Sequence, residues 1–301
     1  MNPTILLRPI GVILKEAWNT YRKHANALAL VCIIPFIFAT VAIIFDPSLA
    51  NNHQAALGMF TLSAIFSLLR LVFLIFMPLA LLATLEEVHH GRHLDVNKAY
   101  NKAFSHGIAY LFVILLTMIV VFGGTLLFII PGIIASIYLT FVLFTFFFEG
   151  KRGIDALVTS AWYVRNIWWD IVARKLILGF FVAAAGFIFL LIVGGIALTA
   201  GFGISVVSFL FNLFIFLGVV PFAVCFAYAL YKDVKLAKEK IPVDPAFIIE
   251  AEKAFVILLI VAALITIVLF IVWNLGPGFQ VPGYQMSMHT HMWRGGGIRS
   301  Y

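Results

Sequence analysis

The amino-acid sequence predicts an all-α, polytopic membrane protein with about seven transmembrane helices and three amphipathic interfacial helices. Of its 301 residues, 63% are hydrophobic and 11% are charged, whereas an ordinary soluble domain has roughly 25% charged residues. Several apolar runs reach the roughly 20 residues that a helix needs to cross a bilayer core of about 30 Å. A transmembrane β-barrel is excluded, because its strands would read as alternating segments of roughly ten residues.

Seven apolar runs are long enough to be transmembrane helices. The first is longer than the roughly 7 to 15 residues of a cleaved signal core, so we expect it to remain as an uncleaved span. The two cysteines, Cys32 and Cys225, fall inside spans, where small packing residues are expected rather than a disulfide or metal site. The expected spans are 25–45, 64–85, 107–129, 132–148, 175–198, 204–230 and 253–274.

The run 107–148 must contain a reversal of the chain. As a single helix it would be about 63 Å long at 1.5 Å per residue, twice what a bilayer needs. Pro131 cannot donate the next helical hydrogen bond, and Gly132 tolerates the positive φ that ends a helix. We therefore expect Pro131 and Gly132 to form the tip of a helical hairpin. The alternative is a proline kink within one long, tilted helix.

The basic residues predict the orientation of the spans. Lys and Arg number four in the N-terminal segment up to Lys23, three in 86–106, five in 149–175 and five in 232–253. The alternate connections carry none, and the tail after Asn274 carries two. Basic residues accumulate on the cytoplasmic side. This distribution predicts a cytoplasmic N-terminus and, with seven spans, an external C-terminus. It also accounts for the net charge of +7 without a nucleic-acid partner.

Three short segments carry one apolar stripe at helical spacing i, i+3, i+4, i+7 and i+8, with polar residues opposite, as in helices that lie flat at the headgroup level. Each precedes a pair of spans, which predicts a unit of one interfacial helix and one hairpin, repeated three times. The alternative is that any amphipathic helix would give this pattern. The stripes are Ile10, Ile13, Leu14, Ala17 and Trp18; Val96, Ala99, Tyr100, Ala103 and Phe104; and Ile154, Leu157, Val158, Ala161 and Trp162.

The repeat sets the predicted domain organisation. Residues 1–235 form the membrane domain, 236–274 a linker and an additional transmembrane helix, and 275–301 an external, disordered tail rich in Gly and polar residues. Asp244 and Pro245 supply a capping carboxylate and a first-turn proline for the last helix.

No catalytic constellation is visible, so we expect no enzyme and no cofactor. Arg70 is the one charge deep in an apolar stretch, either functional or snorkelling to the outer interface. Two possible metal sites are weak: a corner in 86–93, and a tail of soft ligands of the type that binds copper. The corner contains Glu86, His89 and His93, and the tail contains Met286, Met288, His289, His291 and Met292.

The segment from 126 to 177 resembles the membrane domain attached to some bacterial glycerophosphodiester phosphodiesterases and a related set of bacterial inner-membrane proteins. "LRPIGVILKEAWNTYRKH" and "PFAVCFAYALYKDVK" resemble its opening and closing elements, so the resemblance covers about 7–235. It implies the fold and a location in the bacterial cytoplasmic membrane. It implies no hydrolase activity, because a soluble barrel of that kind needs about 250 residues. The matching positions are Pro131, Gly132, Glu149, Ala156, Leu157, Ser160 and Trp168.

We therefore expect a non-catalytic membrane module that contacts lipid or another membrane protein. Basic residues near the surface would hold anionic headgroups at about 1 kcal/mol each, or would only set the topology. The alternative is a carrier or permease for a small or lipid-like solute, with a cavity near Pro35, Pro78 and Pro221. The headgroup candidates are Lys15, Arg22, Lys23, Lys98, Lys102, Lys151, Arg152 and Arg165.

Overall fold

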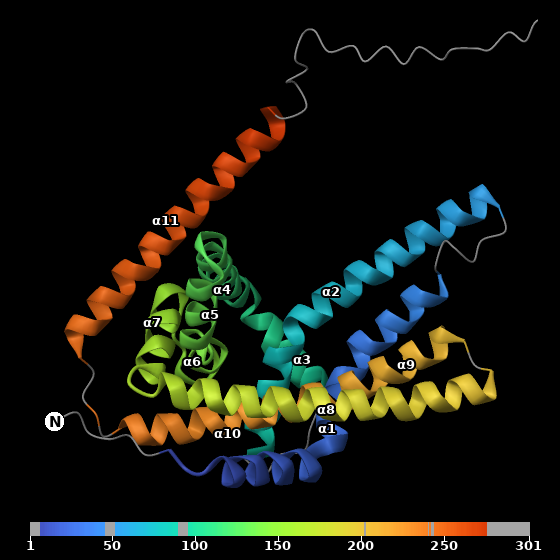
Figure 1. Ribbon diagram of the computed structural model, residues 1–301, viewed down its shortest axis with the longest axis horizontal. Helices are drawn as coiled ribbons and strands as arrows, with labels where there is room; N and C mark the ends of the chain where they lie inside the picture. The colour runs from blue at the N-terminus through green and yellow to red at the C-terminus, as the bar shows by residue number, and fades with distance from the viewer. Residues whose placement is uncertain are drawn as a thin grey trace, which may run out of the picture.

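The computed structural model describes residues 7–45, 52–89, 96–201, 203–239, 241 and 244–275, and every regular element in this part of the chain is a helix (Figure 1). Within these described residues, seven helices are long and apolar enough to cross a membrane. The predicted all-α membrane fold is thereby confirmed. The tail 276–301, with its methionines and histidines, lies outside the described residues.

The helices follow the order of the predicted spans. Several of them are longer than the apolar run that they contain, because a helix continues as long as its backbone hydrogen bonds are made. Their bounds are α1 (Ile10–Ile44), α2 (His53–His89), α3 (Val96–Ser105), α4 (Gly107–Leu127), α5 (Ile129–Tyr138), α6 (Val142–Glu149), α7 (Gly153–Val164), α8 (Trp168–Ala200), α9 (Ile204–Phe214), the π-helix η2 (Ile215–Val219), α10 (Val220–Glu239) and α11 (Pro245–Leu275).

The first predicted interfacial helix and the first span form one element with a kink. The backbone of α1 leaves helical geometry at His24, with φ −122° and ψ 18°. Before this kink, Ile13 and Ala17 are fully buried and Trp18 is 52% exposed. Residues 10–23, called the amphipathic segment below, thus bury two members of the predicted apolar stripe and leave a third, Trp18, exposed.

The other two short helices differ from each other. In α3, Ala99 and Ala103 are buried while Asn97 and Lys98 are exposed. One face of α3 therefore packs against the protein, and the opposite face is open. By contrast, α7 is buried from Ala156 to Val164 except for the partly exposed Thr159. It packs against α4, α6 and α11, and Asp155 of its predicted polar face is exposed. That α7 lies flat at the headgroup level stays a prediction.

The reversal in the run 107–148 lies at Phe128, three residues before the predicted tip. Phe128 is extended, with φ −162° and ψ 151°, between the end of α4 and the start of α5. Pro131 belongs to the first turn of α5, where a helix does not need the missing N–H. Gly132 does not have the positive φ that was expected. A Cβ atom there would lie 2.8 Å from the backbone of Thr125, so glycine is required because the two helices approach closely.

The fourth and sixth spans are interrupted in different ways. The fourth breaks between α5 and α6, at residues 139–141. The sixth continues from α9 through the π-helical turn η2 into α10, a change of helix type that is often found near functional sites. The start predicted for α11 is confirmed, because the Asp244 carboxylate accepts a hydrogen bond from the Ala246 N–H at 3.1 Å and Pro245 is the first helical residue.

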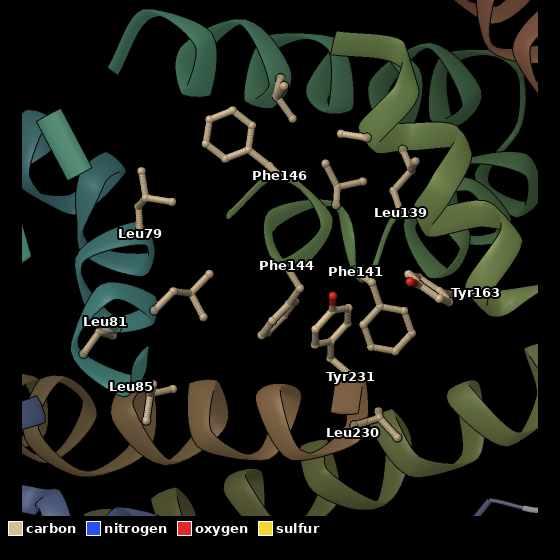
Figure 2. Close-up of a cluster of buried hydrophobic side chains, with 14 of the residues drawn as sticks. Leu79, Leu81, Leu85, Leu139, Phe141, Phe144, Phe146, Tyr163, Leu230 and Tyr231 are labelled. Carbon is tan, nitrogen blue, oxygen red and sulfur yellow. The ribbon is translucent and has the colours of Figure 1, made fainter. Parts of the chain in front are cut away.

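Neighbouring spans pack as hairpins. α1 packs against α2, α4 against α5, and α8 against α9, while α11 packs along α4 (Figure 1). Where α2, α6, α7 and α10 meet, the interior is filled with leucine and aromatic side chains (Figure 2). This core holds Leu79, Leu81, Leu85, Leu139, Phe141, Phe144, Phe146 and Leu230.

Candidate functional site

Ser160 of α7 bridges the break in the fourth span. Its hydroxyl donates to the Tyr138 carbonyl oxygen at 2.7 Å and accepts from the Phe141 N–H at 3.0 Å. Thr145 of α6 donates to the Ala156 carbonyl oxygen at 3.1 Å. A helix break leaves backbone groups without their usual partners, and here α7 supplies them. A serine hydroxyl suits this position because it can donate one hydrogen bond and accept another.

The C-terminal end of α6 places a carboxylate among hydrogen-bond donors. Both Tyr163 and Tyr231 donate their hydroxyls to the same oxygen of Glu149, each at 2.6 Å, and Lys235 lies 3.5 Å from that oxygen. Figure 2 shows the two tyrosine rings approaching one another from α7 and α10. Burial, together with the hydrogen bond to Glu149, raises the pKa of Tyr163. The Tyr163 hydroxyl therefore stays a neutral donor to Glu149.

A pocket of about 310 Å³ opens beside Glu149, between the end of α6, α7, the end of α10 and the start of α11. We call it the lysine pocket. Gly150 ends α6 in the left-handed conformation, with φ 67°, and the chain then passes to Lys151 at the pocket. The lining is Glu149, Lys151, Val158, Thr159, Trp162, Tyr163, Lys235, Lys238, Glu239, Ile241 and Ile248.

The amphipathic segment of α1 lies between two further cavities. On one side is an apolar groove of about 480 Å³ shared with α8, η2 and α10. On the other is a polar pocket of about 290 Å³ that contains Lys23, His24 and Lys232. The Tyr21 hydroxyl donates to the Leu217 carbonyl oxygen in the π-helix at 3.1 Å. The apolar groove is lined by Leu14, Trp18, Tyr21, Phe181, Val182, Ala185, Phe214, Gly218, Val219 and Phe222.

An ionic network fixes the start of α1 to α10 and α8. Arg8 donates to Asp233 from its side chain at 2.6 Å and from its backbone N–H at 3.0 Å, and it pairs with Glu16 at 2.8 Å. The hydrogen bond to Asp233 raises the pKa of Arg8. Arg174, only 8% exposed, donates to the Arg8 carbonyl oxygen at 2.9 Å. The position of the groove thus depends on residues far apart in the sequence.

The predicted headgroup residues do not form one cluster. Lys15, Arg22, Lys23 and Lys98 are exposed on α1 and α3. Lys102 is paired with Glu86 at 2.6 Å, and Arg165 with Asp244 at 2.8 Å. Arg152 is exposed and lies over the Phe146 ring at 4.5 Å, while Lys151 reaches the lysine pocket.

Arg70 lies near the middle of α2 and is partly exposed. Among the described residues, no hydrogen bond or ion pair to Arg70 is present. Partial exposure on a helix 37 residues long is consistent with a side chain that snorkels to an interface. This interpretation of Arg70 stays a prediction.

Two lysines of the lysine pocket, Lys235 and Lys238, are not among the residues predicted above. Lys235 is the last residue of the predicted membrane domain, and Lys238 lies in the predicted linker that follows it. A signal was present, because Lys232, Lys235 and Lys238 are spaced three residues apart and so share one side of a helix. The continuation of α10 to Glu239 makes that spacing meaningful.

The possible metal sites remain untested. His93 and the methionine- and histidine-containing tail lie outside the described residues. Within the residues that the structure describes, no group of three His, Cys, Asp or Glu side chains is arranged to hold a metal ion.

No protein-family model, no curated protein and no solved structure matches the chain.

Proposed function

We propose that the protein is a non-catalytic membrane module that holds anionic lipid at one face. The amphipathic segment of α1 is the site that supports this best. A phospholipid presents an apolar chain and a charged headgroup, and the residues around this segment match both parts. The family resemblance, with its bacterial inner-membrane location, is consistent with such a role.

The observation that carries the proposal is the position of two cations beside the apolar groove. Trp18 lines the groove and is half exposed. Lys15 precedes it by three residues and Arg22 follows it by four, so all three lie along one strip of the helix. Neither cation is paired with a carboxylate among the described residues. An acyl chain in the groove would bring its headgroup to Lys15 and Arg22, with a tryptophan at the interface.

Two ion pairs between basic segments support the orientation of the spans. Arg8 is paired with Asp233, and Arg165 with Asp244, so the N-terminal segment, 149–175 and 232–253 contact one another and lie at the same ends of the spans. These are three of the four segments rich in Lys and Arg. We assign this side to the cytoplasm and the C-terminal tail to the exterior, by the preference of basic residues for the cytoplasmic side.

A carrier is the second candidate, and the broken fourth span is the observation that favours it, since transporters often bind solutes at such breaks. In this chain, however, Ser160 already bonds the backbone groups at the break. The interior beside it is filled by Leu139, Phe141 and Phe144 (Figure 2). A packed interior of this kind favours the module over the carrier.

The test is native mass spectrometry of the protein extracted gently in its own lipids. We expect the wild type to retain a defined anionic phospholipid, and the double variant Lys15→Gln/Arg22→Gln to lose it. Ala185→Phe, which fills the groove, should lose the same lipid. The matched controls are Lys98→Gln, an exposed lysine on α3, and Gly179→Phe, on the exposed face of α8 outside the groove.

Loss of the lipid in both test variants, with retention in both controls, would support the module. If the double variant and Ala185→Phe carry the same lipids as the wild type, the proposal fails, and solute transport becomes the better hypothesis. A lipid lost from Gly179→Phe as well would indicate a general shell of lipid rather than a site, which also contradicts the proposal.

A further inference from the structure

Lys238 is a buried cation that lacks a counter-ion. It is 3% exposed, and burying an ammonium group is costly unless it is paired. Its Nζ donates to the Arg165 carbonyl oxygen at 2.8 Å and lies 4.6 Å from the centre of the Trp162 ring. An ammonium group has three N–H donors, and no carboxylate pairs with it among the described residues. The charge is therefore only partly compensated by the protein.

The same side chain lines the lysine pocket, together with two other lysines. Lys151 reaches the pocket from the chain after α6, and Lys235 from one turn earlier in α10. Arg165 lies against Trp162 at 5.7 Å and Phe247 at 4.4 Å, close behind Lys238. The chain after α6 and the end of α10 thus bring three lysines to one cavity.

The acidic residues of the pocket do not cancel this charge. Glu149 is occupied by two tyrosine hydroxyls and by Lys235. Glu239 is the other acidic lining residue, so three lysines face two glutamates. The remaining lining includes Trp162, Ile241 and Ile248, which suit the carbon atoms of an organic ligand. A bound anion would supply the acceptors that Lys238 and Lys151 lack.

We propose that the lysine pocket binds the phosphate group of a phosphate ester through Lys151, Lys235 and Lys238. Phosphate is the fitting class of anion because its several oxygens accept bonds from more than one cation, and hydrogen bonds between ions are stronger than neutral ones. The phosphate belongs to either a phospholipid or a small soluble molecule. This site is separate from the groove beside α1, so it does not depend on the proposed function.

The test is isothermal titration calorimetry of delipidated protein in a neutral detergent. The probes are inorganic phosphate, dihexanoyl phosphatidic acid and the uncharged dihexanoyl glycerol. We expect phosphatidic acid to bind the wild type and to bind Lys238→Gln at least about tenfold more weakly, because the variant loses an ion pair in a desolvated site. Lys235→Gln, at a more exposed position of the same pocket, should weaken binding in the same direction. Lys98→Gln is the matched control and should bind as the wild type does.

Two outcomes support the site and identify the source of the phosphate. Binding of phosphatidic acid alone indicates a lipid headgroup, while similar binding of inorganic phosphate indicates a soluble ligand. Three outcomes overturn the proposal: no binding of either phosphate probe, equal binding of dihexanoyl glycerol, or wild-type affinity in both Lys238→Gln and Lys235→Gln. Lys15→Gln/Arg22→Gln should remove only the phosphatidic acid bound at the groove beside α1 and leave the binding that Lys238→Gln weakens, so failure here is distinguishable from failure of the lipid site on α1.

Discussion

Two strongly apolar spans of this protein, the fourth span and α8, are enclosed by protein to different degrees. In the unit α4 to α7, half of the most apolar window of the fourth span is buried. In α8, whose most apolar window has a higher mean hydropathy, 2.9 against 2.2, none of that window is buried. The fourth span is enclosed by protein, and α8 presents large apolar side chains such as Phe180, Phe187 and Leu191 outward.

The small and polar residues of the two units account for the difference. Gly124 and Gly132 sit where α4 and α5 approach closely, so that a Cβ atom on Gly124 would lie 3.1 Å from Gly132. Around Gly194 and Gly195 of α8 there is nothing within 4 Å. Ser160 of α7 bonds to α5 and Thr145 of α6 bonds to α7, whereas Thr199 bonds only within its own helix. Hydropathy thus locates a span, and partner contacts decide whether it is enclosed.

The largest expected effect comes from removing the bridge at the break. Ser160→Ala leaves the buried Phe141 N–H and the Tyr138 carbonyl without their partner, and we expect the free energy of unfolding to fall by about 3 kcal/mol. SDS titration in detergent micelles measures it. Thr199→Ala, in the exposed helix α8, should change the free energy of unfolding by less than about 0.5 kcal/mol. Equal effects of the two substitutions would remove the distinction between the units.

The next effect tests the close approach of α4 and α5. Gly132→Ala places a methyl group 2.8 Å from the Thr125 backbone, and overpacking of this kind costs about 2 kcal/mol. Gly195→Ala has open space around it and should be neutral or stabilising by up to about 1 kcal/mol, because alanine favours a helix. SDS titration in detergent micelles measures the free energy of unfolding of both variants. A neutral Gly132→Ala would show that the helices can separate without cost.

A smaller effect is expected from the carboxylate at the end of α6. Glu149→Gln keeps an acceptor for Tyr163 and Tyr231 but loses the charge, which should lower the free energy of unfolding by about 1 to 2 kcal/mol. The control on α8 is Asp170→Asn. The Asp170 carboxylate is exposed and lies 3.5 Å from the buried Arg174, which keeps its bonds to the Arg8 and Asp170 carbonyl oxygens, so the loss should be less than about 1 kcal/mol. Thermal unfolding followed by intrinsic fluorescence measures both. A larger loss in Asp170→Asn would contradict this ranking.

The smallest effect concerns pH and the start of α11, which packs on α4. The hydrogen bond from Arg165 lowers the pKa of Asp244. A lowered pKa means that this contribution to stability is complete above the ordinary carboxyl pKa and is lost as the pH falls through the lowered value. In a pH series of unfolding measurements, Asp244→Asn should therefore approach the wild type at acid pH and differ from it near neutrality. A difference that does not depend on pH would contradict the assignment.

The sequence by itself determined the elements of this protein. Apolar length specifies seven spans, because a helix must satisfy its own backbone bonds in a bilayer. The spacing of apolar residues predicts the short helices at 10–18, 96–104 and 154–162, and Asp244 with Pro245 predicts the start of α11. The reversal near Pro131 was predicted to within three residues. These features depend on local chemistry that neighbouring residues carry.

Only the tertiary structure decided which elements are enclosed and which side chains meet. The apolar stripe of α7 has the same period as that of α3, but contacts from α4, α6 and α11 bury most of the residues of the helix α7. Lys151, Lys235 and Lys238 converge on one pocket, and Trp18 and Tyr21 line a groove that α8 and α10 complete. These contacts join residues that are tens to hundreds of positions apart. No local pattern encodes them, because they depend on which helices pack together.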